Sequence, residues 1–226
     1  MKIDITIKIA GEAGQGLQTM GQLIARSLAR SGLNVFAHQV LQSRIRGGHN
    51  WFQIRVSDAP VLAPCDTTDI LIALDNASSC HLQELKKESI LILDSSSVKI
   101  TTDKGIVLDL PLEKIARESA GNKLMANMAA VGAVCGLLEL ETNILSDLIR
   151  ESFGLKSRDI AELNIKASRG GYDYVYKKVP GNNFSLLSCP KMAPKMLISA
   201  SESIALGALA AGCKFISAYP MSPSTG

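Results

Sequence analysis

Several features that would place this chain in a special class of protein are missing from it. The sequence has no run of about 18 apolar residues, the length that a membrane-spanning helix needs. Residues 1–10 alternate polar and apolar side chains and lack the apolar block of a secretory signal. We therefore expect a cytoplasmic protein with no membrane partner. A content of 46% hydrophobic and 20% charged residues also excludes a disordered tail, a collagen-like fibre and a coiled coil.

Cysteine is present five times but never in a metal-binding pattern. The two nearest cysteines are fifteen residues apart and no CxxC occurs, so neither a local zinc site nor an iron–sulfur cluster is expected. The adjacent Cys80 and His81 are interpreted as a coincidence at a helix end. The sequence also has no obvious nucleophile–base pair and no paired carboxylates. We therefore predict no metal ligand and no catalytic residue in this chain.

Acidic residues are absent from one long window, residues 13–57. This window contains no lysine and carries a charge of +5, against −2 for the rest of the chain. Its basic residues are Arg26, Arg30, Arg44, Arg46 and Arg55. Because the planar guanidinium group suits phosphate and carboxylate, the window predicts an anionic ligand. No nucleic-acid partner is expected. A chance gap between acids is the alternative.

Hydrophobic periodicity predicts an α/β protein. Residues 3–9 alternate as a strand with one less buried face, which suggests a place near a sheet edge. A helix follows over residues 17–28 and ends at Gly32. Further strands are predicted over residues 35–37, 51–56, 70–74, 90–93 and 106–108, and helices over 81–87, 123–140, 145–153 and 159–168. This alternation favours a mainly parallel sheet with flanking helices, which is a Rossmann-like arrangement.

The last fifty residues differ from the rest. Residues 177–195 are rich in proline, glycine and asparagine without periodicity, and are predicted to be a linker. A helix over 201–211 and a strand over 214–218 follow, too little to bury a core. We therefore expect a complete domain over 1–176, a linker over 177–195, and the truncated start of a second α/β domain over 196–226.

A glycine-rich turn joins the first strand to the first helix. Such a turn lets the backbone approach a phosphate, while free amides at the helix start attract negative charge. The order G-x-x-G-x-G differs from the G-x-G-x-x-G of dinucleotide-binding proteins. Glycines needed only for close packing are the alternative. The candidate anion-binding residues are Gly11, Gly14, Gln15 and Gly16.

A second glycine cluster lies in the acid-free window. Its two adjacent glycines can form a backbone nest rimmed by guanidinium groups. A bulged hairpin turn with solvated arginines is the alternative, and His49 beside it is interpreted as a hydrogen-bonded turn residue. The candidate residues are Ser43, Arg44, Arg46, Gly47 and Gly48.

These segments resemble the gamma domain of the 2-oxoacid:ferredoxin oxidoreductases. The resemblance rests on residues 11–16, 43–49 and 54–57, in that order. Residues 205–225 resemble the opening of the alpha-subunit pyrimidine-binding domain. Weaker matches lie at residues 72–75, 127–132, 161–167 and 171–172. The chain is thus similar to a fused gamma–alpha subunit.

The resemblance implies a function for the whole complex. Family members decarboxylate a 2-oxoacid such as pyruvate, ketoisovalerate or 2-oxoglutarate, pass electrons to ferredoxin and transfer the acyl group to coenzyme A. Both glycine clusters would then lie near coenzyme A. Thiamine diphosphate, magnesium and iron–sulfur clusters would belong mostly to partner subunits, above all a beta subunit. The active enzyme would be a hetero-oligomer, and the isolated chain would be inactive. Residues near thiamine and substrate would be Tyr219, Pro220, Ser222 and Thr225.

Two other functions stay open at this point. A nucleotide-binding dehydrogenase domain would need an acidic residue after the second strand, where this chain has His38 and Gln39. A non-catalytic interaction module would use the glycine turn and the arginine segment for subunit contacts.

Overall fold

The computed structural model describes residues 3–42, 47–154, 157–179, 184–186, 192–219 and 221. These residues divide into two compact units, a first unit over Met1–Lys195 and a second over Met196–Gly226. None of the described helices is long and apolar enough to cross a membrane.

The first unit is built on a six-stranded mixed sheet with the order β2-β3-β1-β4-β5-β6. The pairs β1–β4, β4–β5 and β5–β6 are parallel, while β3 is antiparallel to both β1 and β2. The strands are β1 Asp4–Ala13, β2 Asn34–Val40, β3 Gly47–Ser57, β4 Thr68–Ala73, β5 Leu85–Leu93 and β6 Ile106–Asp109. The predicted α/β class with a mainly parallel sheet is confirmed.

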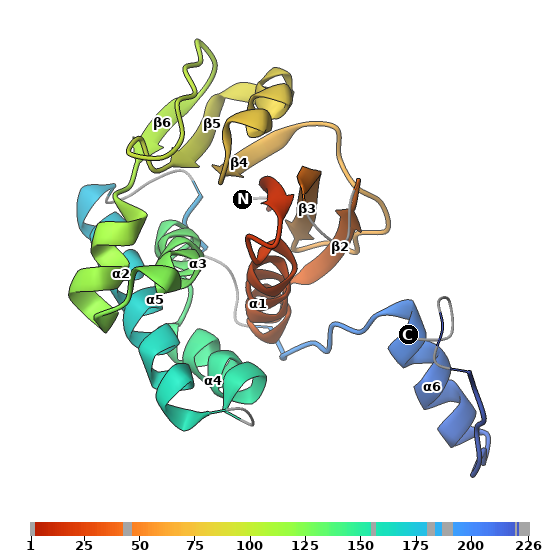
Figure 1. Cartoon of the computed structure of the whole chain (residues 1–226). Helices are drawn as coiled ribbons and strands as arrows, with labels where there is room; N and C mark the ends of the chain where they lie inside the picture. The colour runs from red at the N-terminus through yellow and green to blue at the C-terminus, as the bar shows by residue number, and fades with distance from the viewer. Residues whose placement is uncertain are drawn as a thin grey trace. The chain divides into compact units, whose positions relative to one another are not determined.

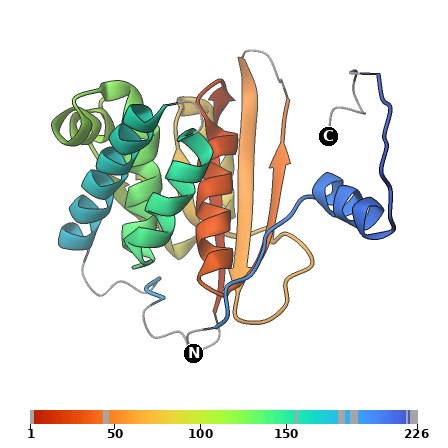
Figure 2. The same cartoon turned by 90° about the horizontal axis from the view of Figure 1, so that it is seen from below.

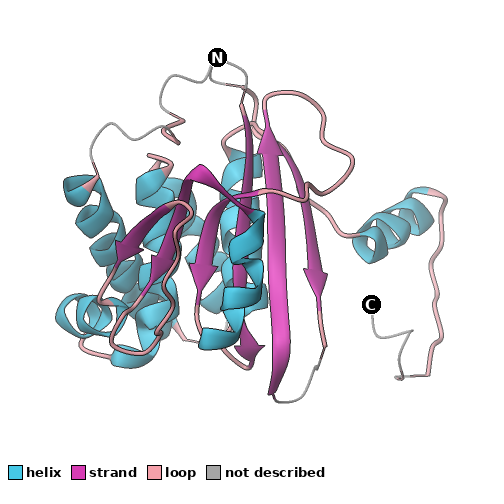
Figure 3. Ribbon diagram, turned by 90° about the horizontal axis from the view of Figure 1, so that it is seen from above, coloured by secondary structure: helices cyan, strands magenta, loops and turns pink. Residues whose placement is uncertain are grey.

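Five α-helices of the first unit cover one face of this sheet, as Figures 1 and 2 show. They are α1 Leu17–Arg30, α2 Leu112–Ala120, α3 Ala126–Leu137, α4 Thr142–Phe153 and α5 Arg158–Lys178. Two 3₁₀ segments accompany them, η1 Asn76–Glu84 and η2 Lys123–Met125. In the view of Figure 3 the helices lie behind the strands. The small residues of α3 serve contact with α5, since a Cβ on Gly132 would lie 1.8 Å from the Ser168 carbonyl oxygen.

The opposite face of the sheet carries a second hydrophobic core. Ala10, Leu71 and Leu91 pack there with Val98 and Ile100, and Trp51 lies against them. Lys8 and Thr6 share this face of β1 with Ala10 and are buried. The predicted edge position of residues 3–9 is therefore wrong. β1 lies inside the sheet, and its polar side chains have buried partners instead of solvent.

Two other element predictions were also wrong, and one helix was missed. Residues 81–87 were predicted to be a helix, but η1 ends at Glu84 and Lys86 lies in β5. The helix α2, which buries Leu112, Ile115, Ala116 and Ala120 along one face, was not predicted. Residues 214–218 form no strand in the described part of the second unit, which holds helix α6, Ala200–Ala210. A strand needs a hydrogen-bonding partner, and these residues have none of that kind here.

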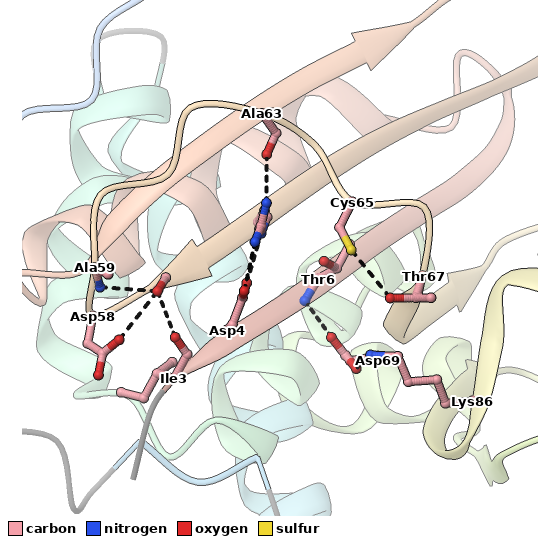
Figure 4. Close-up of polar contacts among 12 residues, drawn as sticks. Ile3, Asp4, Thr6, Asp58, Ala59, Ala63, Cys65, Thr67, Asp69 and Lys86 are labelled. Carbon is pink, nitrogen blue, oxygen red and sulfur yellow. Dashed lines mark hydrogen bonds and ion pairs between the residues drawn. The ribbon is translucent and has the colours of Figure 1, made fainter.

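At the amino-terminal end of β1, polar contacts join β1 to β3 and β4, and Arg55 of β3 also donates to the Ala63 carbonyl in the long connection from β3 to β4 (Figure 4). The amide of Thr6 donates to Asp69 at 2.8 Å, and the Ser57 hydroxyl donates to the Ile3 carbonyl at 2.7 Å. Arg55 binds Asp4 through two hydrogen bonds of 2.8 and 2.7 Å. This polar end of the sheet lies opposite the glycine turn, which follows the carboxyl end of β1.

Candidate functional site

The glycine turn of residues 11–16 is held from two sides by specific contacts. The Gln15 side chain accepts from the Glu12 amide at 2.7 Å and donates to the Leu74 carbonyl at 3.2 Å. Asn127 at the start of α3 donates to the Gln15 carbonyl at 2.6 Å. The turn is thereby attached to the end of β4 and to α3, and its backbone is held in one position.

Glycine is required at the start of α1. Gly16 is the N-cap residue with φ 77°, a backbone conformation that other residues rarely adopt. Gly14 has φ 96°, and a Cβ on it would meet no atom within 4 Å. No side chain caps α1 and no acidic residue lies in its first turn, among the described residues. Its first amides are therefore available to an anion at an open face of the turn.

The sheet brings the two predicted glycine clusters together. In the antiparallel β1–β3 pair, Glu12 lies opposite His49 and Ala13 lies opposite Gly47, with a register shift between them. Gly48 has φ 72°. The β2–β3 hairpin agrees with the hairpin alternative, while Ser43, Arg44 and Arg46 lie outside the described residues. The backbone of Gly47 and Gly48 thus lies beside the glycine turn.

Three arginines of the window over residues 13–57 have acidic partners in the folded chain. Arg30 forms a two-bond pair with Glu151 at 2.9 and 2.7 Å, and Arg26 lies 3.7 Å from the same carboxylate. Arg55 is paired with Asp4. Three of the five arginines therefore lie beside acids that are distant in sequence, with Arg26 and Arg30 sharing the single charge of Glu151. The expectation of an anion site does not extend to these three arginines, and for Arg44 and Arg46, which lie outside the described residues, it stays a prediction.

The candidate residues at the chain's end belong to the second unit. Tyr219 is described and exposed, whereas Pro220, Ser222 and Thr225 lie outside the described residues. Their role near thiamine and substrate stays a prediction.

A buried polar cluster was missed by the sequence analysis. Glu84 accepts from His81 Nδ1 at 2.7 Å and from the Thr68 hydroxyl at 2.8 Å, and it forms an ion pair with Lys8. Burial by itself would raise the pKa of Glu84, but the hydrogen bonds from His81, Lys8 and Thr68 hold it at about 2. Lys8 was visible in sequence only as a lysine inside an apolar strand.

Two histidines extend this cluster toward the glycine turn. The Nε2 atoms of His49 and His81 are 2.9 Å apart, and His49 Nδ1 lies 4.0 Å from Asp75. Burial and the neighbouring His81 lower the pKa of His49. Asp75 caps η1, because its carboxylate accepts from the Ser78 amide at 2.9 Å. His49 is thus a strand residue with a buried partner, not the turn residue that was expected.

The strand arrangement disfavours the dehydrogenase alternative. In a dinucleotide-binding fold the second strand runs parallel beside the first and presents an acid to the ribose. Here β2 is an edge strand separated from β1 by the antiparallel β3. β2 therefore does not lie where an acidic residue at its end could bind the ribose of a dinucleotide.

Comparisons with known proteins all identify the same group of oxidoreductases. Residues 6–174 match the family described as pyruvate ferredoxin/flavodoxin oxidoreductase. The chain is 31% identical over 175 residues to the 2-oxoglutarate synthase subunit KorC of Archaeoglobus fulgidus, covering 76% of this chain and 89% of that protein. It is 21% identical over 269 positions to the alpha subunit of 2-oxoacid:ferredoxin oxidoreductase 2 of Aeropyrum pernix, covering 99% of this chain and 42% of that subunit.

A solved structure is similar to the whole chain. It is the 2-oxoglutarate:ferredoxin oxidoreductase of Magnetococcus marinus with 2-oxoglutarate, coenzyme A and succinyl-CoA bound. The TM-score is 0.82 at 25% identity, over 100% of this chain and 40% of that chain. The chain thus spans nearly all of a short relative and about two fifths of long ones.

Proposed function

We propose, on the premise that this chain belongs to the pyruvate ferredoxin/flavodoxin oxidoreductase family, that it is the gamma domain and the start of the alpha part of a 2-oxoacid:ferredoxin oxidoreductase. The whole enzyme would oxidatively decarboxylate a 2-oxoacid to an acyl-CoA. The likeness to a long chain over the full 226 residues supports the fused arrangement.

The role proposed for this chain is to bind coenzyme A. The observation that carries it is the open face of Gly14 in front of the uncapped start of α1, with Gly47 and Gly48 alongside. Backbone amides at such a turn bind phosphate without any lysine. Arg44 and Arg46 would add charge from the adjoining segment.

The redox cofactors are proposed to reside on partner subunits. Cys135 is fully buried in α3, and burial raises the pKa of its thiol to about 12, so it is not a thiolate ligand. The other described cysteines, Cys65, Cys80 and Cys213, form no four-thiolate group. The described residues therefore do not fit an iron–sulfur cluster. We expect thiamine diphosphate with magnesium, the clusters and the contact to ferredoxin to involve a beta subunit.

An isosteric pair of variants at Gly14 tests the coenzyme A site in the assembled enzyme. Asparagine and aspartate both tolerate a positive φ, but only aspartate repels a phosphate. Gly14→Asp should raise the KM for coenzyme A roughly tenfold, about 1.4 kcal/mol, relative to Gly14→Asn. The KM for the 2-oxoacid should stay unchanged in both.

A second pair addresses the arginine segment. Arg44→Ala and Arg46→Ala should each raise the KM for coenzyme A, while the matched Arg26→Ala should not. If none of these changes moved that KM, the turn and the segment would be subunit contacts, which is the interaction-module alternative.

A further inference from the structure

The strongest unassigned feature of the first unit is a group of three metal-ligand side chains. His49 lies near the start of β3, while Cys80 and His81 lie in η1. One ligand atom from each of the three lies within 4.8 Å of the other two. His49 and Cys80 are 31 positions apart in sequence, so no spacing pattern could have identified the group.

Each histidine has a carboxylate on its outer side. His81 Nδ1 lies 2.7 Å from Glu84, and His49 Nδ1 lies 4.0 Å from Asp75. At hydrogen-bond distance, as for His81, a carboxylate holds the proton on Nδ1 and leaves the Nε2 lone pair for a metal, whereas His49 Nδ1 is too far from Asp75 for a hydrogen bond. The two Nε2 atoms lie 2.9 Å apart, so in the absence of a metal one of them carries a proton and donates it to the other.

The cluster also contains buried polar atoms that are unsatisfied. His49 Nδ1 and Asp75 Oδ2 have no hydrogen-bond partner among the described residues. Buried polar atoms in native proteins are nearly always bonded, so a small rearrangement of His49 that brings Nδ1 to Asp75 would satisfy both. Coordination of a metal ion by His49 Nε2 would hold the imidazole ring in that rearranged position.

We propose that His49 Nε2, His81 Nε2 and the Cys80 thiolate bind one Zn²⁺ ion, with water in the fourth position. Nitrogen and sulfur ligands are those that zinc prefers, at about 2.0–2.3 Å. In such a tetrahedron the two nitrogens stand about 3.3 Å apart, so the present pair separates by only a few tenths of an ångström. Cys80 is exposed, which leaves its side chain free to turn toward the ion.

The charges nearby suit a divalent cation. The Cys80 thiolate, Asp75 and Glu84 balance Zn²⁺ together with the ammonium group of Lys8, which already pairs with Glu84. Binding would connect the start of β3 to η1, directly after residues 43–48. Zinc would thus be a structural clip that holds the start of β3 beside the glycine turn. This inference does not depend on coenzyme A binding.

Metal titration of the full chain tests the site. After removal of metal with a chelator, Zn²⁺ should bind one to one by calorimetry and raise the melting temperature. Co²⁺ should bind with the sulfur-to-cobalt charge-transfer band in the near ultraviolet and tetrahedral d–d bands in the visible. Cys80→Ser should abolish the charge-transfer band while retaining weaker binding.

Matched variants decide whether these residues are the ligands. His49→Gln should weaken Zn²⁺ binding at least a hundredfold, whereas His38→Gln and Cys65→Ser should leave it unchanged. His81→Gln is a second test, with circular dichroism of the metal-free protein as the measure of folding. Absence of stoichiometric binding, or equal binding by His49→Gln and His38→Gln, would overturn the proposal and leave a proton shared between two histidines.

Discussion

At the scale of single residues, the polar side chains of β1 have the largest consequence. Lys8 is 4% exposed, in a strand whose other face carries Ile5, Ile7 and Ile9. Its charge is tolerated because Glu84 and the Trp51 ring surround it, the latter with its centroid 5.8 Å from Nζ. A buried charge without a partner is far more costly than a buried pair.

Removal of the partner charge should therefore destabilise the chain. We expect Glu84→Gln to lower the free energy of unfolding by about 2–4 kcal/mol, because Lys8 stays buried without a counter-charge. Glu88 on the following strand, β5, is exposed, so Glu88→Gln serves as the matched control. Urea denaturation measures both. Equal effects of the two substitutions would show that the pair contributes nothing.

Asp109 at the end of β6 gives a pH-dependent prediction. Hydrogen bonds from the Ser95 hydroxyl and amide, at 2.6 and 2.9 Å, lower the pKa of Asp109. Because the folded-state pKa lies below the unfolded one, the contribution to stability is complete above the usual value of about 4 and is lost as pH falls through the folded pKa.

Asp109→Asn should therefore be less stable than the unchanged chain at pH 7, and the difference should shrink on acidification below about pH 4. Thermal unfolding at pH 7, 5 and 3 measures this. The exposed Asp103→Asn is the control. A difference that is constant over the pH range would contradict the assigned cause.

At the scale of elements, helix packing depends on small residues at crossings. Besides Gly132, Gly171 on α5 lies so close to α3 that a Cβ would stand 1.9 Å from the Ala129 carbonyl oxygen. The backbone atoms at this crossing cannot move aside as the flexible end of a side chain can. The two helices therefore approach closely only while both positions carry glycine.

Gly132→Ala should force α3 and α5 apart. We expect a loss of about 2–3 kcal/mol in the free energy of unfolding, the range for overpacked cores. Gly207→Ala in α6 meets no atom within 4 Å and should be neutral or stabilising by up to about 1 kcal/mol. Denaturant unfolding of both variants provides the comparison, and a harmless Gly132→Ala would contradict the close crossing.

At the scale of the whole molecule, the sheet order places the glycine turn and the start of β3 side by side, at the carboxyl end of β1. β1 carries the turn, β3 returns beside it in the opposite direction, and η1 follows β4 on its other side. Residues 11–16, 47–49 and 75–84 thereby surround one end of β1. Every proposal about function made above depends on this juxtaposition.

The proposed function predicts that the chain alone has no turnover. It spans 42% of an alpha subunit to which it is similar, so we expect 2-oxoacid-dependent reduction of an electron acceptor only when the remaining alpha part and a beta subunit are added. A coupled assay with a viologen dye measures this. Turnover by the isolated chain would contradict the assignment of the redox cofactors to partners.

Local patterns in the sequence were sufficient for much of the fold and for one candidate site. Alternating and 3.6-residue periodicities identified β1, α1 and most other elements, and the glycines that need positive φ identified the turn, because these are properties of neighbouring residues. The edge position of β1 was wrong, since the burial of Lys8 depends on Glu84, 76 residues away.

Only the tertiary structure decided which charges act and which are balanced. Arg26, Arg30 and Arg55 appeared free in an acid-free window, but they lie beside Glu151 and Asp4 from outside it, with Arg26 and Arg30 sharing Glu151. His49, Cys80 and His81 gave no recognisable spacing, and the pairing of β1 with β3 and β4 brings them together. Periodicity is read from neighbours along the chain, whereas electrostatic partners and ligand sets form between segments that only the sheet topology joins.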